Sequence, residues 1–366
     1  MRSIEGADAA PFHDSEANSL VRFRRFTHAW QTAMAIGMED EEFVSIARRI
    51  PLVETPLYEL EGVLIKDETG NLSGSHKARH LAGLIMWLEV AQRIDPSLAS
   101  ARLATASCGN AAMAAATIAH AVGRRLDVFV PEHAVTDELE RLGANVRRCR
   151  RRDGERGDPA YLRFREAVDD GALPFTCQGP DNGLTIEGGQ TLAWELAAQL
   201  SEPIDRLFVQ VGGGALASAV SAGLSEAHSL GVLAKLPRIH AVQAKSVAPL
   251  ARAWTRVQRY DLAAAIRRRS QVMWPWETRP HSVATGIIDD ETYDWVAVIR
   301  GMQQTGGWPV VVSEDELRQA TRLAGGSVSA TGAAGLAGLL TMRKRREIGP
   351  DERCCVLFTG VARESH

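Results

Sequence analysis

The chain has 366 residues, of which 45% are hydrophobic and 24% charged, and its formal net charge at pH 7 is −3. This length can hold a large core in two domains or lobes, and the composition is that of an ordinary soluble globular protein. The charge gives no electrostatic reason to expect nucleic acid or an anionic membrane as a partner, and no apolar run reaches the roughly 20 residues of a membrane-spanning helix.

Cysteine and histidine usage argues against disulfides and metals. The five cysteines are odd in number and lack metal-ligand spacing, which indicates a reduced interior. The ten histidines form no HExxH motif or paired cluster, so we expect no metal site. The first residues include no hydrophobic segment of signal-peptide type. We therefore expect a cytoplasmic protein.

The predicted elements before residue 77 are an N-terminal helical segment and two strands. Residues 1–50 mix charges with aromatic side chains and are expected to form an N-terminal helical extension. Glu54-Thr-Pro-Leu-Tyr58 predicts a turn into a strand, and 62–66 predicts a further strand. Small and polar residues follow, and a long helical pattern begins at Lys77.

Lys77 lies where a strand and loop become a helix, and Gly74 and Ser75 just before it allow other groups to approach closely. A lysine that is partly desolvated at such a place can have its pKa lowered and act as a nucleophile. A lone lysine at a helix start is more commonly just solvated, so the functional interpretation depends on motifs further along the chain.

An alternation of strands and helices follows the lysine helix. Strands are predicted at 102–107, 126–130 and 145–149, and helices at 111–122 and 135–142. This alternation has the spacing of β-α-β units, which form parallel sheets covered by helices on both faces.

A second alternating half occupies the rest of the chain. Helices are predicted at 184–200, from Ala215 onward, after the capping-box spacing Ser313–Glu316, and from Thr331. The expected strands are 175–177, 206–211, 238–243, 310–312 and 354–358. The fold class is therefore α/β, with two lobes, each an open and mostly parallel sheet flanked by helices.

Several charged residues are predicted to have no catalytic role. Residues 147–156 hold six arginines, which could bind an anion but are more typical of a solvated loop. The carboxylates expected to be surface or helix-end charges are Asp67, Glu68 and Glu187.

Residues 212–216, Gly-Gly-Gly-Ala-Leu, lie between a predicted strand and helix and are called the glycine loop below. Glycine amides at a helix N-terminus form a concavity that holds a phosphate. The stretch also fits the dinucleotide pattern GxGxxA through Ala217. That alternative needs an acidic residue after the next strand, and the chain instead continues to Lys245 without a carboxylate.

A nucleophilic lysine combined with a phosphate-binding loop suggests pyridoxal phosphate held as a Schiff base. Ser107-Cys-Gly-Asn110 adds a tight turn at a helix start, and Thr331 adds a hydroxyl at another. Together with Ser73-Gly-Ser-His-Lys-Ala-Arg79, these motifs resemble the fold-type II pyridoxal phosphate enzymes, the group of threonine synthase and the serine/threonine dehydratases. The resemblance extends from Glu54 to Gly360, with the motifs in the family's order.

The resemblance implies roles for individual residues. Lys77 is the Schiff-base lysine, Asn110 faces the ring oxygen of the cofactor, and Thr331 faces its pyridine nitrogen. His76 stands where the family usually has Phe, and Cys108 where it commonly has Ser or Thr. The implied cofactor-binding residues are Lys77, His76, Asn110, Gly212, Gly213, Gly214, Ala215, Leu216 and Thr331. The implied carboxylate-binding residues of the substrate loop are Ser107, Cys108, Gly109 and Asn110.

The irregular, aromatic segment 274–286 is expected to shape the substrate pocket. His281, Ser282 and Thr285 are candidate substrate contacts, with ordinary loop chemistry as the alternative. We also expect a division into an extension (1–50), a large cofactor-binding domain (51–80 plus 176–366) and a smaller mobile domain (81–175). The cofactor would lie in the cleft between the lobes.

The resemblance implies an enzyme that acts on a small amino-acid substrate and assembles as a homodimer. The neutral hydroxyl of Thr331 favours β-elimination of the dehydratase or ammonia-lyase type, through an aminoacrylate intermediate. A synthase of the threonine synthase kind, which replaces a β- or γ-substituent, is the alternative. A cofactor-binding homologue without activity is a third interpretation, against which the intact Lys77, Asn110 and glycine loop argue.

Overall fold

The computed structural model describes residues 8–363. The described chain forms two compact units. Unit 1 contains residues 8–13, 55–70 and 192–363, and unit 2 contains residues 14–54 and 71–191. Residues 14–54 thus belong to the same unit as the lysine motif. The functional division into a large cofactor-binding domain and a smaller mobile domain stays a prediction.

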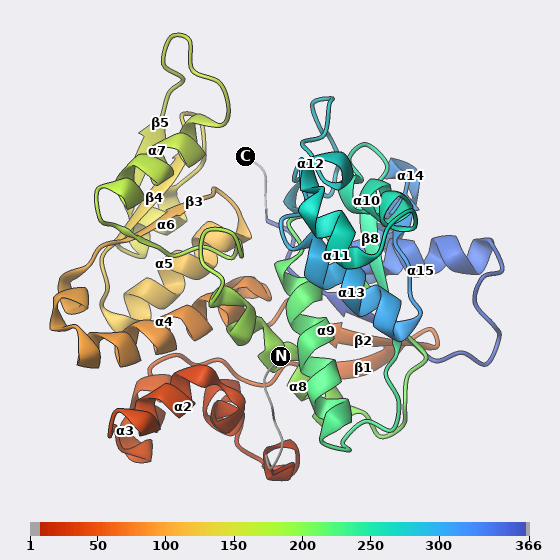
Figure 1. Ribbon diagram of the computed structural model, residues 1–366, viewed down its shortest axis with the longest axis horizontal. Coiled ribbons are helices and arrows are strands. Elements are labelled where there is room, and N and C mark those ends of the chain that lie inside the picture. Colours follow the sequence, from red (N-terminus) through yellow and green to blue (C-terminus); the bar gives the residue numbers. More distant parts are fainter. Residues whose placement is uncertain (1–7, 364–366) are drawn as a thin grey trace. The chain divides into compact units, whose positions relative to one another are not determined.

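Unit 1 is built on a six-stranded sheet, which Figure 1 shows with its helices. All neighbouring strands are parallel except the edge strand β1, which pairs antiparallel with β2. The central strands β7 and β10 are buried along their whole length, as in parallel sheets covered on both faces. In spatial order the strands are β1 (Leu57–Leu60), β2 (Val63–Asp67), β10 (Cys354–Phe358), β7 (Arg206–Gln210), β8 (Arg238–Ala244) and β9 (Val310–Val312).

The helices of unit 1 follow the strands in alternation. Helix α15 packs against β7, β8, β9 and β10 and against α14, and α9 packs against β7 and α13. Helix α14 begins with the predicted capping box between Ser313 and Glu316. The elements are η1 (Ala10–His13), α9 (Ala215–Ser229), α10 (Pro249–Val257), α11 (Leu262–Arg267), α12 (Arg269–Val272), η5 (Thr285–Ile287), α13 (Trp295–Thr305), α14 (Glu314–Ala324) and α15 (Ala334–Lys344).

Unit 2 holds a four-stranded parallel sheet in the order β5 (Asn145–Cys149), β4 (Leu126–Pro131), β3 (Leu103–Ala106) and β6 (Leu173–Pro174). Helix α7 (Pro159–Asp169) packs against β3, β4 and β5. The strand expected at 175–177 is wrong, because pairing with β3 ends at Pro174 and the N–H of Phe175 makes the last bond, to the Ala104 carbonyl at 2.7 Å. Proline is tolerated at this position because the N–H groups of Leu173 and Phe175 make the bonds to β3, so the N–H that Pro174 lacks would face the free side of the edge strand.

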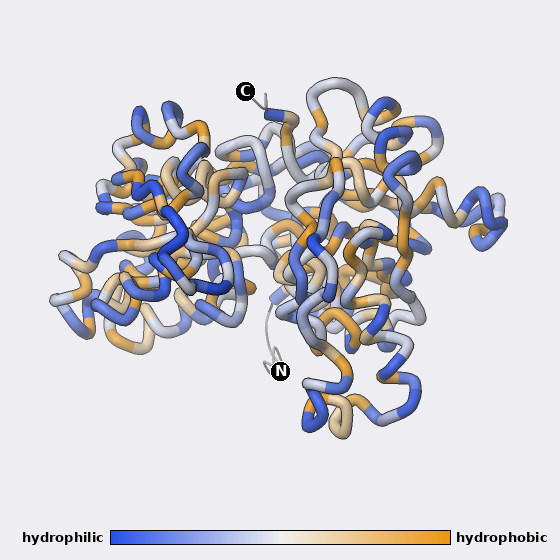
Figure 2. The backbone as a smooth tube through the Cα atoms, turned by 90° about the horizontal axis from the view of Figure 1, so that it is seen from above, coloured by the Kyte–Doolittle hydropathy of each residue, from blue (hydrophilic) through white to orange (hydrophobic). Residues whose placement is uncertain are grey.

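The other helices of unit 2 bury a shared apolar core, to which Phe43, Ile50, Leu81 and Ile85 contribute fully buried side chains. Figure 2 shows hydrophobic and hydrophilic residues alternating along the helices, as expected for helices with one face on a core. The helices are α1 (Ser19–Arg22), η2 (Arg24–Phe26), α2 (His28–Ala35), α3 (Asp40–Arg48), η3 (Leu72–Gly74), α4 (Lys77–Ile94), η4 (Pro96–Ser100), α5 (Asn110–Val122) and α6 (Asp137–Arg141).

Helices α4 and α8 (Thr185–Gln199) touch backbone to backbone. A Cβ atom at Gly83 would lie only 2.7 Å from Cα of Gly188, and one at Gly188 would overlap the Arg79 carbonyl. Two glycines therefore allow the helix that begins at Lys77 to lie directly on α8. Between residues 8 and 363, every helix is too short or too polar to cross a membrane.

Candidate active site

Lys77 stands at the first position of α4, directly after a tight turn. Ser73 and Gly74 both adopt left-handed backbone conformations, with φ of 61° and 73°. Such a conformation is unusual for serine and makes the chain reverse sharply before the helix. The Lys77 side chain is half-buried, and the Sγ atom of Cys177 lies 3.8 Å from its carbonyl oxygen.

The chain has only four other lysines, and none matches this setting. Lys66 is fully buried, and its ammonium donates to the Thr55 carbonyl (2.6 Å), Glu195 (2.8 Å) and Gln199 (2.9 Å). These three acceptors hold Lys66 as a charged structural group. Lys235 pairs with Asp205, and the remaining two lysines, Lys245 and Lys344, are exposed. Lys77 is therefore the lysine best placed for nucleophilic chemistry.

Two histidines flank the lysine on α4. His76 is buried, and its ring meets that of His80 edge to face at 5.8 Å. Nδ1 of His80 lies 2.8 Å from the carbonyl oxygen of Thr185, so this nitrogen carries the hydrogen. Burial, with the positive charge of Lys77 as a second cause, lowers the pKa of His80 to about 4. His80 is thus neutral at physiological pH and adds no positive charge beside Lys77.

The substrate loop predicted at 107–110 leaves the carboxyl end of β3 and enters α5. The N–H of Gly109 donates to Oγ of Ser107 at 3.3 Å, and Asn110 is the first residue of the 13-residue helix. The Cys108 thiol is exposed. The first N–H groups of a helix have no partner inside it and attract anions. Because η3 packs against α5, unit 2 brings the lysine turn next to this helix.

In unit 1 the glycine loop connects β7 to the 15-residue helix α9. Gly214 is the N-cap, with a φ of 101° that favours glycine. A side chain on Gly212 would overlap the carboxylate of Asp289, and a Cβ atom on Gly213 would lie 2.9 Å from the ring of Tyr293. Gly212 and Gly213 therefore have no room for side chains, so the chain before α9 is bare backbone at a helix N-terminus, as in phosphate-binding loops.

Residues 286–294 cover the glycine loop, which the sequence did not reveal. The N–H of Asp294 donates to the Gly213 carbonyl at 2.9 Å, and Thr292 packs beside Gly214. Oδ2 of Asp294 is buried without a hydrogen-bond partner among the described residues. Burial raises the pKa of Asp294 to about 6, so the neutral form is favoured more than in an ordinary carboxyl group.

The same segment connects the glycine loop to Thr331. The N–H of Gly286 donates to Oγ1 of Thr331 at 2.9 Å, and Cα of Ile287 is 3.0 Å from a Cβ placed on Gly212. Thr331 lies in the turn before α15 and not inside the helix, which begins at Ala334. Unit 1 therefore brings the glycine loop and Thr331 together through residues 286–287.

The three candidate substrate contacts differ in their surroundings. His281 and Thr285 are exposed. Oγ of Ser282 accepts the N–H of Ala284 at 3.1 Å, which is the local turn chemistry considered as the alternative. These contacts stay a prediction.

These features fit pyridoxal phosphate. The glycine loop can hold a phosphate on backbone amides at the N-terminus of α9, and unit 2 offers the half-buried amine of Lys77. A dinucleotide is less suited, because β8 ends at Ala244 and Lys245 follows. In unit 1, two hydrogen bonds fix the segment that connects Thr331 with the glycine loop. Gly286 donates to Thr331, and Asp294 donates to the Gly213 carbonyl.

Residues 46–360 match the family model described as pyridoxal-phosphate dependent enzyme. The chain belongs to this family. A threonine synthase of Methanocaldococcus jannaschii is 24% identical over 359 residues, covering 92% of this chain and 80% of that protein. A threonine synthase of Mycobacterium tuberculosis (strain H37Rv) is 27% identical over 283 residues, covering 75% and 70%. The cofactor is therefore pyridoxal 5′-phosphate.

The solved structure of the processed form of threonine deaminase isoform 2 from Solanum lycopersicum is similar to this pyridoxal-phosphate-dependent enzyme, with a TM-score of 0.65 and 18% identity. The similarity covers 90% of this chain and 92% of the other. It confirms the predicted fold, that of the fold-type II enzymes, with parallel sheets flanked by helices.

Two carboxylates expected to be surface or helix-end charges of the enzyme are buried, although Glu187 does lie in the first turn of α8. Glu68 is fully buried and accepts the hydroxyl hydrogen of Thr55 at 2.6 Å. Glu187 is buried in unit 2, where it accepts the indole N–H of Trp87 at 2.7 Å. Thr55 lies 13 residues from Glu68 and Trp87 lies 100 residues from Glu187, so local patterns could not show these contacts. The six arginines of residues 147–156 are all exposed, as a solvated segment predicts.

Proposed function

We propose that this enzyme catalyses β-elimination on an amino acid that carries a leaving group on Cβ. The proposal rests on Thr331. Its Oγ1 atom accepts a hydrogen bond from the N–H of Gly286, so the hydroxyl hydrogen is available to another acceptor. An unprotonated pyridine nitrogen is such an acceptor, whereas a protonated one would require a carboxylate as its partner.

This pairing influences the type of reaction. When bound, pyridoxal phosphate supplies an electron sink for charge that develops at the substrate Cα. With an unprotonated ring nitrogen the sink is weaker, so prompt expulsion of a β-substituent after loss of the α-proton is favoured. A neutral hydroxyl at Thr331 therefore supports elimination over reactions that need a long-lived carbanion.

The chain's own groups would divide the remaining work. Lys77 would bind the aldehyde carbon of the cofactor and, once released as a free amine, would take the proton from the substrate Cα. The glycine loop would hold the cofactor phosphate on its amides. The N-terminus of α5, at Asn110, would bind the substrate carboxylate and hold Cα in place.

Replacement at the γ-carbon, as a threonine synthase performs it, is the second candidate. It is supported by sequence similarity, since both relatives described above carry that name. A phosphate-bearing substrate of that reaction would need a cationic contact in addition to the glycine loop, which the cofactor phosphate would occupy.

Product analysis of the purified, cofactor-loaded enzyme separates the candidates. We expect L-serine or L-threonine to yield a 2-oxo acid and ammonia, and Lys77→Ala to abolish this release. Lys245→Ala is the matched control, because it removes an exposed lysine. Release of inorganic phosphate from O-phosphohomoserine, with no 2-oxo acid from either amino acid, would replace the proposal with the synthase.

A further inference from the structure

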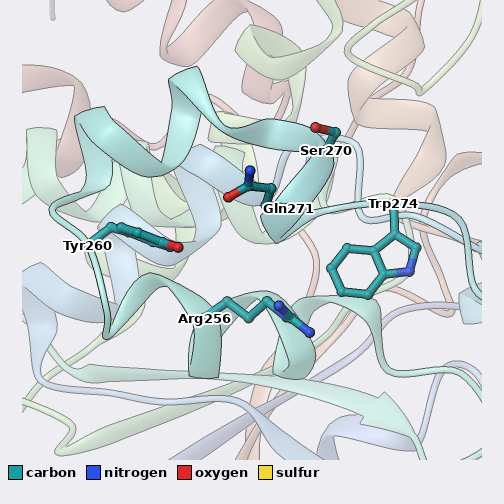
Figure 3. Close-up of a pocket in the computed structure, with 5 residues that line it drawn as sticks. All are labelled: Arg256, Tyr260, Ser270, Gln271 and Trp274. Carbon is teal, nitrogen blue, oxygen red and sulfur yellow. The ribbon is translucent and has the colours of Figure 1, made fainter.

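A hollow in unit 1 lies outside the features described so far (Figure 3). Its volume is about 530 Å³, and it is lined by Arg256, Tyr260, Ser270, Gln271 and Trp274. Helix α10 supplies Arg256 and α12 supplies Ser270 and Gln271, while Trp274 lies two residues after the end of α12. The lining thus combines a guanidinium group, two hydroxyls, an amide and two aromatic rings.

The chain around this hollow is strongly basic, although the protein as a whole is slightly acidic. Residues 249–272 contain one aspartate and six arginines, Arg252, Arg256, Arg259, Arg267, Arg268 and Arg269. Two of these are neutralised by ion pairs, Arg252 with Glu277 and Arg269 with Glu291. The positive charge that remains attracts small anions to the hollow.

Arg256 is held in a way that favours anion binding. Its guanidinium carbon lies 4.8 Å from the ring centre of Trp274, which also carries Arg252 at 3.7 Å. Among residues 8–363, Arg256 has no carboxylate as an ion-pair partner. Stacking occupies the flat face of a guanidinium, so the N–H groups at its edge stay available as donors. Their geometry matches the oxygens of a phosphate.

Neutral donors complete the site. Figure 3 shows the Tyr260 hydroxyl pointing toward the middle of the hollow and Arg256 extending below it toward Trp274, while Gln271 and Ser270 lie above on α12. Arg268 lies 5.0 Å from the ring centre of Tyr260 and adds positive charge at that end. We propose that this hollow binds the phosphate group of a small anionic effector.

The hollow is connected to the glycine loop through Gln243. Oε1 of Gln243 accepts the N–H groups of Leu250 (2.9 Å) and Ala251 (3.2 Å) in the first turn of α10. Its Nε2 atom donates to the carbonyl of Val211, the residue before the glycine loop, at 3.2 Å and to Thr292 at 3.3 Å. An effector that shifts α10 would therefore change how firmly the loop holds the cofactor, a consequence that rests on the proposed function.

Binding is tested by calorimetry on the cofactor-loaded protein in phosphate-free buffer, with inorganic phosphate, pyrophosphate and phenyl phosphate as probes. We expect Arg256→Ala to weaken binding by on the order of tenfold or more, because a hydrogen-bonded charge is lost. Arg256→Lys should weaken binding less, since lysine keeps the positive charge but loses the paired N–H donors of the guanidinium. Tighter binding of phenyl phosphate would indicate an organic monoester, and equal binding would indicate free phosphate.

Arg259→Ala is the matched control, because Arg259 is exposed nearby but does not line the hollow. The proposal is overturned if no probe binds at millimolar concentration, if Arg256→Ala binds like the wild type, or if Arg259→Ala loses as much affinity. None of these results depends on which amino acid reacts. Coupling predicts that saturating phenyl phosphate changes the dissociation constant of the cofactor more in the wild type than in Arg256→Ala. An equal change in both would show simple competition at the glycine loop and contradict the coupling.

Discussion

The contact between α4 and α8 gives a sharp prediction for Gly188→Ala. Glycine inside a helix is unfavourable, so replacement by alanine would by itself stabilise α8 by about 1 kcal/mol. The new Cβ atom would however overlap the carbonyl oxygen of Arg79 and lie 3.0 Å from the Gly83 nitrogen. These are backbone atoms of the helix that begins at Lys77, and they cannot turn aside as a flexible side chain could.

The two effects oppose each other, and their sizes decide the outcome. Overpacking a tight contact costs about 1–3 kcal/mol, and a backbone-to-backbone contact belongs at the upper end. After the gain in helix propensity is subtracted, we expect the free energy of unfolding to fall by about 2 kcal/mol. Pushing α4 away from α8 should also move the first turn of α4, which carries Lys77, and lower the rate at which product is formed.

Urea denaturation measures this change, provided that the slope of the transition is the same in both proteins. Gly70→Ala is the matched control, because no atom lies within 4 Å of its Cβ position, and its effect should stay within about 0.5 kcal/mol. A Gly188→Ala protein as stable as the wild type, or more stable, would refute the reasoning. It would mean that the helices separate at little cost.

Three further predictions concern buried and close-packed groups. The raised pKa of Asp294 destabilises the folded protein once the pH exceeds the unfolded value of 3.8, and the loss is complete above about pH 6. The stability of Asp294→Asn relative to wild type should therefore rise by up to about 3 kcal/mol across that window, and a flat difference in urea midpoints would contradict this. Lys66→Met removes the buried ammonium that Glu195 contacts at 2.8 Å and should cost about 3–5 kcal/mol by urea denaturation, whereas adding Glu195→Leu should recover much of it. Gly213→Ala places a methyl group against Tyr293 and should weaken cofactor binding in a spectroscopic titration; unchanged affinity would count against the glycine loop as the phosphate site.

Local chemistry explains which features the sequence could predict. The helix at Lys77, the capping box at Ser313 and the turn at the glycine loop depend on neighbouring residues, and all three appear in the structure. The cover of the glycine loop could not be predicted, because Asp289 lies more than 70 residues away and reaches Gly212 only through the fold.

The burial of two carboxylates could not be predicted from the sequence for the same reason. Glu68 and Glu187 follow no apolar period that would place them inside, and their partners Thr55 and Trp87 come from other elements. A charged residue can be buried only when such partners surround it, and no local pattern reports them. The strand ending at Pro174 was misplaced by a few residues, because the apolar run at 175–177 continues beyond the last pair with β3.

The identity of the reactive lysine tests the account most directly. The cofactor-loaded protein is treated with sodium borohydride, which fixes the cofactor to the amine that holds it, and is then digested and analysed by mass spectrometry. The account predicts a single labelled lysine, Lys77, and no label in Lys77→Ala. A label on Lys66, Lys235, Lys245 or Lys344 in the wild type, or no label at all, would contradict it.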